Sequence, residues 1–228
     1  RLRAHFRDQA GSCRRLGSPF TAVLLDGLAD RLEPGTEPFD RLFAWPGDMR
    51  ADALALRVAG ALHALVLEGA DRALAAVYPP NRTDAARLVE VAHDALARNA
   101  DFVDHWIDRP PQTNEVARSA MLLPGLVTVA AETGLDLSLL EIGASSGLNL
   151  LADRWGYDYG GRRAGPGDAP LTLAPETVGA PPIAPFPRVV RRAGCDLSPL
   201  DPCDPADRLR LRACVWPDQD RRLARLDA

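Results

Sequence analysis

A glycine-containing stretch with one acid is the part of this sequence best suited to bind a ligand. Residues 139–150 read Leu-Leu-Glu-Ile-Gly-Ala-Ser-Ser-Gly-Leu-Asn-Leu, so Glu141 stands two positions before Gly143 and Gly147 follows four positions later. Glycines let a backbone turn sharply and approach a ligand closely, and a helix start offers free N–H groups. Together with a carboxylate, these groups suit a ligand that carries amino and carboxylate groups.

Three motifs overlap this stretch. It is similar to the acid-x-Gly-x-Gly-x-Gly turn of class I methyltransferases, which binds S-adenosylmethionine, with Ser145 at the middle glycine. The dinucleotide fingerprint fits less well, because the outer glycines stand four apart rather than five. Residues 143–147 also match the nucleophile elbow Gly-x-Ser-x-Gly. The four histidines all precede Ser145, so a hydrolase would need its histidine from a further C-terminal segment.

A second acid, Asp196, follows the apolar run at 189–193. At the end of a second strand, a carboxylate can accept hydrogen bonds from both ribose hydroxyls of a nucleoside. Asp196 lies about fifty residues past the glycine turn, where about twenty is usual in nucleotide folds, and an insertion at 157–187 would account for the difference. Asp158 has the better spacing but reads as a turn residue, and a turn or capping role for Asp196 stays open.

One arginine belongs to the same hypothesis. Arg118 lies at the start of the helix that precedes the first strand, and its guanidinium is suited to the carboxylate of an amino-acid ligand. The polar stretch at 112–119 also fits simple helix capping. The predicted cofactor-binding residues are therefore Glu141, Gly143, Ala144, Ser145, Gly147, Asn149, Asp196 and Arg118.

Composition excludes several other activities. The sequence contains no lysine, so no Schiff-base or Walker lysine is present. A net charge of -4 predicts no general attraction to nucleic acid. None of the four cysteines forms a Cys-x-x-Cys pair, which argues against a metal site. No apolar run reaches membrane-spanning length and no signal peptide opens the chain, so we expect a cytoplasmic protein without a membrane partner.

Hydrophobic periodicity predicts an α/β protein. Residues 1–134 show helical spacing, which indicates a helical N-terminal domain, and short apolar runs begin after residue 135. Residues 135–228 are expected to form a Rossmann-like α/β domain with a proline- and glycine-rich insertion at 157–187. A helical pattern that runs to the last residue suggests that this domain is truncated at its C-terminus. We expect residues 137–142 to form a central parallel strand, followed by a helix that begins between 145 and 148, with 189–193 paired beside it.

Several short motifs carry a resemblance that extends over nearly the whole chain. They are Ser18-Pro19, the helix at 61–69, Gln112-Thr113-Asn114-Glu115, the glycine turn, Gly194–Pro199 and Val215-Trp216-Pro217. The chain thereby resembles an uncharacterised bacterial family catalogued as domain of unknown function 2332. Its turn is similar to that of the methyltransferase superfamily, which implies S-adenosylmethionine as cofactor and a small molecule or a protein as substrate. A non-catalytic binding or scaffold protein is the main alternative, and a serine hydrolase is the third.

Overall fold

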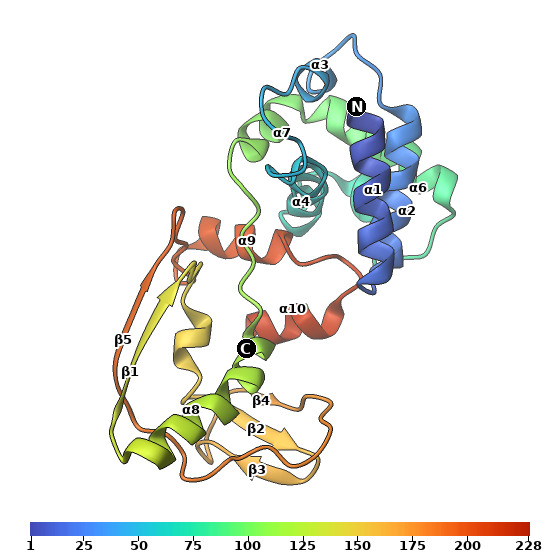
Figure 1. Cartoon of the computed structure of the whole chain (residues 1–228). Coiled ribbons are helices and arrows are strands. Elements are labelled where there is room, and N and C mark those ends of the chain that lie inside the picture. The colour runs from blue at the N-terminus through green and yellow to red at the C-terminus, as the bar shows by residue number, and fades with distance from the viewer. The chain divides into compact units, whose positions relative to one another are not determined.

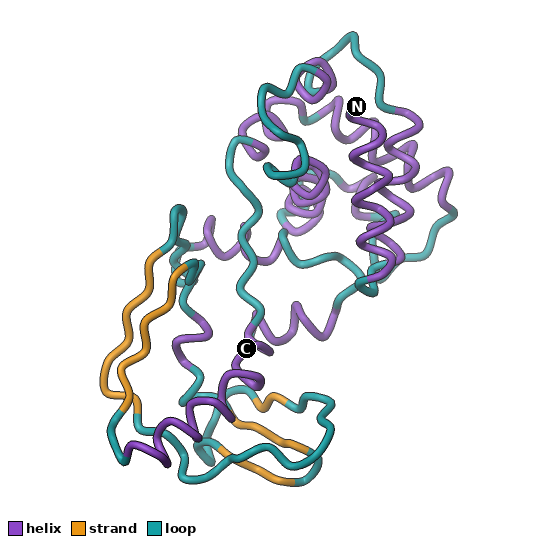
Figure 2. Tube along the Cα trace, in the orientation of Figure 1, coloured by secondary structure: helices purple, strands orange, loops and turns teal.

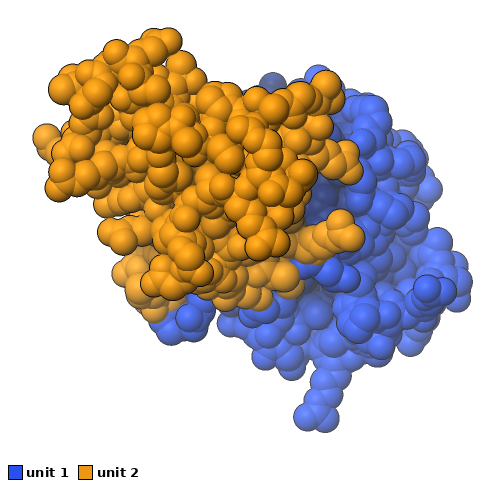
Figure 3. All heavy atoms as spheres, turned by 90° about the horizontal axis from the view of Figure 1, so that it is seen from below, with its two compact units in different colours: residues 1–112, 205–220 blue, residues 113–204, 221–228 orange.

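The computed structural model describes residues 1–228 and divides into two compact units, coloured separately in Figure 3. Unit 1 comprises residues 1–112 and 205–220, and unit 2 comprises residues 113–204 and 221–228. Helices cover about half of the chain, and one small sheet is parallel. The protein is therefore of the mixed α/β class.

Unit 1 is built from helices around α4, whose sequence is almost wholly apolar. Most residues of α4 are buried, and they pack with Phe6 of α1 and Leu25 of α2 in one continuous core. Each fully buried leucine contributes about 1.5–3 kcal/mol. The helices of unit 1 are α1 (Leu2–Arg15), α2 (Pro19–Arg31), α3 (Phe39–Phe43), α4 (Leu54–Leu67), α5 (Arg72–Ala75), α6 (Ala85–Arg98), α7 (Ala100–Ile107) and α9 (Pro205–Ala213).

Two of the motifs in the sequence meet at the start of α2. Ser18 is the N-cap of this helix, because its hydroxyl accepts a hydrogen bond from the Thr21 N–H. The same hydroxyl donates to Asp218 over 2.5 Å, and the other Asp218 oxygen accepts the Phe20 N–H at 2.9 Å. A carboxylate near the C-terminus of the chain therefore completes the cap of the second helix.

Two buried arginines hold the C-terminal end of α7. Arg57 donates to the carbonyl oxygens of Ile107 and Asp108, and Arg210 donates to those of residues 106, 109 and 110. A cation is favourable at a helix C-terminus, where carbonyl groups lack helical partners. These contacts satisfy two guanidinium groups that would otherwise be costly to bury.

Unit 2 contains the strands and the glycine turn. The chain enters it through the 3-10 helix η1 and helix α8, and Gly134 ends α8 with φ +65°. The elements of unit 2 are η1 (Val116–Arg118), α8 (Ser119–Thr133), β1 (Leu137–Ile142), η2 (Leu148–Leu151), β2 (Gly156–Tyr159), β3 (Arg162–Ala164), β4 (Thr172–Leu173), β5 (Val189–Cys195) and α10 (Asp220–Asp227), whose first residue belongs to unit 1.

The predicted pairing of the first and last strands is confirmed, because β1 and β5 run parallel with Glu141 opposite Gly194. The expectation that β1 is a central strand is wrong. These two strands are the whole sheet, so β1 is an edge strand. On its outer face, Leu140 is 75% exposed and Ile142 is 92% exposed. The apolar run at 137–142 thus specified a strand, as predicted. A central parallel strand is covered on both faces, whereas one face of β1 is exposed.

The insertion at 157–187 forms a second sheet with strand order β3-β2-β4 (Figure 1). Tyr157 and Tyr159 of β2 are buried against Leu123 and Val127 of α8, in a core separate from that of unit 1. The alternation of strands and long loops in this part is visible in Figure 2. This small folded piece separates β1 from β5 along the chain and accounts for the long spacing between Glu141 and Asp196.

The two compact units do not divide the chain at residue 134. Residues 113–134, including α8, belong to the unit that contains both sheets, and residues 205–220, including α9, belong to the helical unit. Compact units need not be independently folding domains. The division into domains at 1–134 and 135–228 therefore stays a prediction.

Candidate functional site

The turn after β1 adopts backbone conformations that glycine favours. Gly143 and Gly147 have φ of +73° and +75°, which explains why glycines occupy these two positions. Ser145, between them, also has a positive φ, at +52°. A serine in this left-handed region is strained by about 1 kcal/mol or more.

The turn is anchored to the end of β5. The N–H groups of Gly143 and Ala144 both donate to the Cys195 carbonyl oxygen, at 2.8 and 3.1 Å. The Ser145 N–H donates to Asp196 at 2.8 Å, and the other Asp196 oxygen accepts the Ser198 N–H at 2.9 Å. Asp196 therefore stands at the end of β5, as the sequence predicted, and it also closes the glycine turn.

The expected helix after the turn is shorter than the sequence suggested. It begins at Leu148, within the predicted range, but it consists of the four-residue 3-10 helix η2 rather than a longer α-helix. The Leu148 carbonyl oxygen accepts the indole N–H of Trp155 at 3.3 Å. The strong helix dipole that we expected for ligand binding is therefore absent, and side chains are the main groups that this site offers.

Glu141 is the first of these side chains. It lies on the inner face of β1, and its Oε2 atom is buried without a hydrogen-bond partner. Burial raises the pKa of the Glu141 carboxyl group, while the charge of Arg118 and a hydrogen bond from Asn149 lower it in part. A buried acceptor without a donor is costly, so a ligand that donates a hydrogen bond at this oxygen would be favoured.

Residues of η1 and α8 also act on Glu141. The Ser119 hydroxyl donates to Asn149 Oδ1 at 3.1 Å, which orients the Asn149 amide toward Glu141. Arg118 is exposed, and its charge acts on Glu141 without a direct ion pair between them. The structure thus brings together Arg118, Glu141 and Asn149, which the sequence assigned to one site.

Asn114 is a residue of this site that the sequence analysis missed. Its buried side chain accepts the Leu148 N–H at 2.8 Å and the Ser146 hydroxyl at 3.2 Å, and its amide donates to the Ala144 carbonyl oxygen at 3.2 Å. Asn114 therefore holds the turn on both sides of Gly147. For this stretch we expected either helix capping or a ligand contact through Arg118, and Glu115 fills the capping role by accepting the Ala117 N–H.

The hydroxyl of Ser145 has no hydrogen-bond partner, although the residue is only 6% exposed. A nucleophilic serine needs a base within hydrogen-bond reach, and no such base contacts Ser145 here. The match to the nucleophile elbow is thus not accompanied by the geometry of a hydrolase. The Ser145 hydroxyl is thus a second buried polar atom without a partner, in addition to Oε2 of Glu141.

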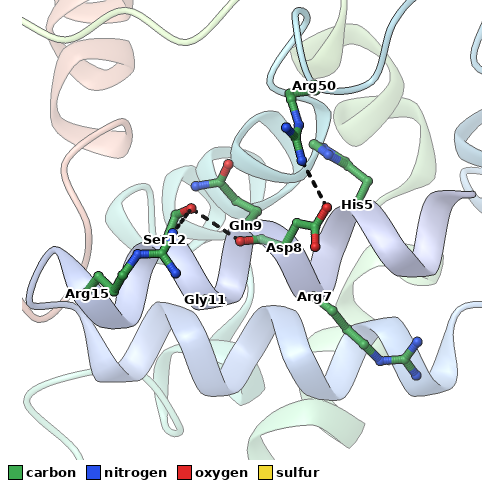
Figure 4. A pocket seen from close by; sticks show the side chains of 8 residues that line it. All are labelled: His5, Arg7, Asp8, Gln9, Gly11, Ser12, Arg15 and Arg50. Atoms are coloured by element: carbon green, nitrogen blue, oxygen red, sulfur yellow. Dashed lines mark hydrogen bonds and ion pairs between the residues drawn. The ribbon is translucent and has the colours of Figure 1, made fainter.

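A polar pocket of about 490 Å³ lies on α1 in unit 1 (Figure 4). Its polar side chains are already engaged. Arg50 pairs with Asp8 at 3.0 Å, Arg15 donates to Ser12 at 3.0 Å, and His5 accepts the Ala55 N–H at 3.2 Å. We therefore place the candidate site at the glycine turn of unit 2, where Oε2 of Glu141 and the hydroxyl of Ser145 lack partners and lie among the residues that the sequence motif assigned to a ligand.

The fold and this site define a mixed α/β protein with a glycine turn closed between two carboxylates at the ends of paired parallel strands. The chain belongs to the family described as "Uncharacterized protein conserved in bacteria (DUF2332)", which it matches over residues 3–228. The family expected from the sequence motifs is thereby confirmed. Comparison with the curated proteins and with the solved structures found no match, so the likeness to methyltransferases receives no support from them. No helix combines the length and apolarity needed to cross a bilayer.

Proposed function

We propose that unit 2 binds S-adenosylmethionine at the glycine turn and uses it for methyl transfer. The observation that carries this proposal is the unpartnered, buried Oε2 atom of Glu141, together with the exposed guanidinium of Arg118, whose charge acts on that carboxyl group. A carboxylate and a guanidinium near one another suit the ammonium and carboxylate groups of an α-amino acid. S-adenosylmethionine carries such a group and needs no phosphate-binding lysine.

Under this proposal, the nucleoside part of the cofactor lies toward Asp196. A carboxylate oxygen can accept more than one hydrogen bond, so Asp196 can hold the turn and accept from ribose hydroxyls together. Strands β1 and β5 would then be the first two strands of a Rossmann-like sheet. The turn and the charged side chains around it would supply the contacts to the cofactor.

Methyl transfer needs few reacting groups from the protein. The cofactor supplies an electrophilic methyl group on a sulfonium, and catalysis depends mainly on holding an acceptor in line with it. Glu141, Arg118 and Asn149 would fix the amino-acid end, while Asn114 keeps the turn in shape. The acceptor is a small molecule or a protein.

A non-catalytic binding or scaffold protein is the second candidate. The observation that favours it is the internal pairing of the N–H groups of Gly143, Ala144 and Ser145, which leaves fewer donors for a ligand than a methyltransferase turn would need. A binding test with the cofactor's demethylated product separates the two candidates, because a scaffold protein would not bind it.

The test is the melting temperature of the chain with S-adenosylhomocysteine, the demethylated product. A ligand at a hundredfold excess over its Kd stabilises the native state by about 2.7 kcal/mol, so a clear upward shift is expected. Glu141→Gln and Arg118→Gln should each weaken binding tenfold or more. Glu132→Gln, which removes an exposed acid from α8, is the matched control and should bind normally.

Adenosine distinguishes the two ends of the site. It lacks the amino-acid group, so Arg118→Gln should leave its weak binding unchanged while that of S-adenosylhomocysteine falls. No shift with millimolar S-adenosylhomocysteine would contradict the proposal and favour the scaffold.

A further inference from the structure

A cleft of about 460 Å³ opens in unit 2 beside α8. One wall is the exposed face of α8 at Met121 and Pro124, and the opposite wall is the loop at 175–181 that follows β4. This volume lies within the range of small-molecule sites, and the cleft is open to solvent, with Met121 80% exposed. The apolar and aromatic side chains that line the cleft include Met121, Pro124, Tyr159, Pro175, Val178 and Pro181.

The cleft is largely apolar. Prolines stand on both walls, and proline fixes its own backbone φ, so these positions lose little freedom when a ligand enters. Tyr159 is only 4% exposed, and its hydroxyl donates to the Ala120 carbonyl oxygen at 2.6 Å. This bond engages the hydroxyl as a donor and leaves the ring as the part of Tyr159 that lines the cleft.

The charge of the cleft limits its ligand. Glu176 is the single charged residue among those that line it. An acid at the edge of an apolar cleft disfavours an anion and favours a neutral or cationic molecule. This also argues against fatty acids and phosphorylated compounds.

The cleft begins close to the proposed cofactor site. Met121 follows Arg118 by three residues, and residues three apart on a helical surface are neighbours, with Cβ atoms about 5–6 Å apart. Arg118 is the residue that we assign to the carboxylate of the cofactor. A molecule in the cleft would therefore lie one helical turn from that end of the site.

We propose that this cleft binds a neutral or cationic apolar small molecule and that this molecule is the methyl acceptor. That a ligand binds in the cleft is inferred from the geometry of the cleft alone. That this ligand is the methyl acceptor rests on the proposed function, and separate measurements test binding and the acceptor role.

The test uses Nile red, a neutral apolar dye whose fluorescence rises in apolar surroundings, with the whole chain. We expect saturable binding, and Met121→Asp should weaken it tenfold or more. Leu122→Asp is the matched control, because Leu122 is the next residue on α8, is 50% exposed and does not line the cleft. Its Kd should stay within about twofold of the wild-type value.

A second pair of variants guards against misfolding. Val178 and Leu197 are both fully exposed, but only Val178 lines the cleft. Val178→Asp should weaken dye binding and Leu197→Asp should not. Equal effects within each pair, or no saturable binding, would overturn the cleft as a ligand site. Dye binding that changes with protein concentration, together with self-association in size-exclusion chromatography, would assign the cleft to a second copy of the chain and also overturn it.

The thermal shift with S-adenosylhomocysteine tests the acceptor role separately from dye binding. If dye binding depends on Met121 but S-adenosylhomocysteine produces no thermal shift, the binding site stands and the acceptor role is overturned. If both ligands bind, Met121→Asp should leave the shift with S-adenosylhomocysteine unchanged, since Met121 does not belong to the cofactor site. Loss of that shift would contradict two separate sites.

Discussion

At the scale of single residues, Ser145 is the most unusual position in the site. It combines a left-handed backbone with a buried hydroxyl that has no partner. Both features cost free energy, and such costly arrangements are typical of functional sites. The same features predict how the protein responds to substitution.

Ser145→Gly should stabilise the chain by about 1 kcal/mol, because glycine tolerates φ of +52° and removes the orphan hydroxyl. Ser145→Ala removes only the hydroxyl and should stabilise less. Urea unfolding measures both. A destabilised Ser145→Gly variant would show that the hydroxyl has a partner in solution. We also expect no labelling of the wild type by a fluorophosphonate, since no base is hydrogen-bonded to the Ser145 hydroxyl.

At the scale of elements, distant segments complete each other's caps. Ser18 and Asp218 together cap α2, just as Asn114 holds the turn before η2. Neither partner is visible in the local sequence, although Ser18-Pro19 and Val215-Trp216-Pro217 stood out as motifs. The structure shows that Asp218, which directly follows the second motif, forms hydrogen bonds with the segment of the first.

A double-mutant cycle tests this cap. Ser18→Ala and Asp218→Ala should each cost about 1–2 kcal/mol, as the loss of an N-cap usually does. Because both changes break the same hydrogen bond, the double variant should cost less than the sum, with a coupling of about 1 kcal/mol. Additive losses would mean that the two residues act independently.

At the scale of the whole molecule, a buried histidine makes stability depend on pH. His63 lies in the core of unit 1, where its Nδ1 atom is 3.3 Å from the Ala213 carbonyl oxygen. Burial lowers the pKa of His63 to about 4 from the ordinary 6.5. The unfolded chain therefore takes up a proton at a higher pH than the folded chain, so stability falls as pH drops below 6.5 and stops falling near 4.

From pH 7.5 to pH 5, His63 should account for a loss of about 2 kcal/mol in the free energy of unfolding. His63→Gln keeps a hydrogen-bond donor for Ala213 but does not titrate, so its stability should depend less on pH by that amount. Urea unfolding at the two pH values measures the difference. A parallel pH dependence of variant and wild type would contradict burial of neutral His63.

The sequence by itself determined the features that depend on local patterns. The glycines at 143 and 147 predicted a sharp turn, because glycine readily adopts positive φ, and the apolar runs at 137–142 and 189–193 predicted strands. Each of these features depends on residues within a few positions of one another. The parallel pairing of the two strands was predicted from the α/β pattern of the whole region rather than from either run alone.

The tertiary structure alone decided which distant groups meet. It placed Asn114 on the turn, bound Asp196 to Ser145, left the Glu141 oxygen without a donor, and made β1 an edge strand in a two-stranded sheet. The physical reason is that hydrogen-bond partners and strand neighbours are chosen by the packing of the whole chain. A local pattern specifies that a polar group or an apolar face must be satisfied, but not by which residue.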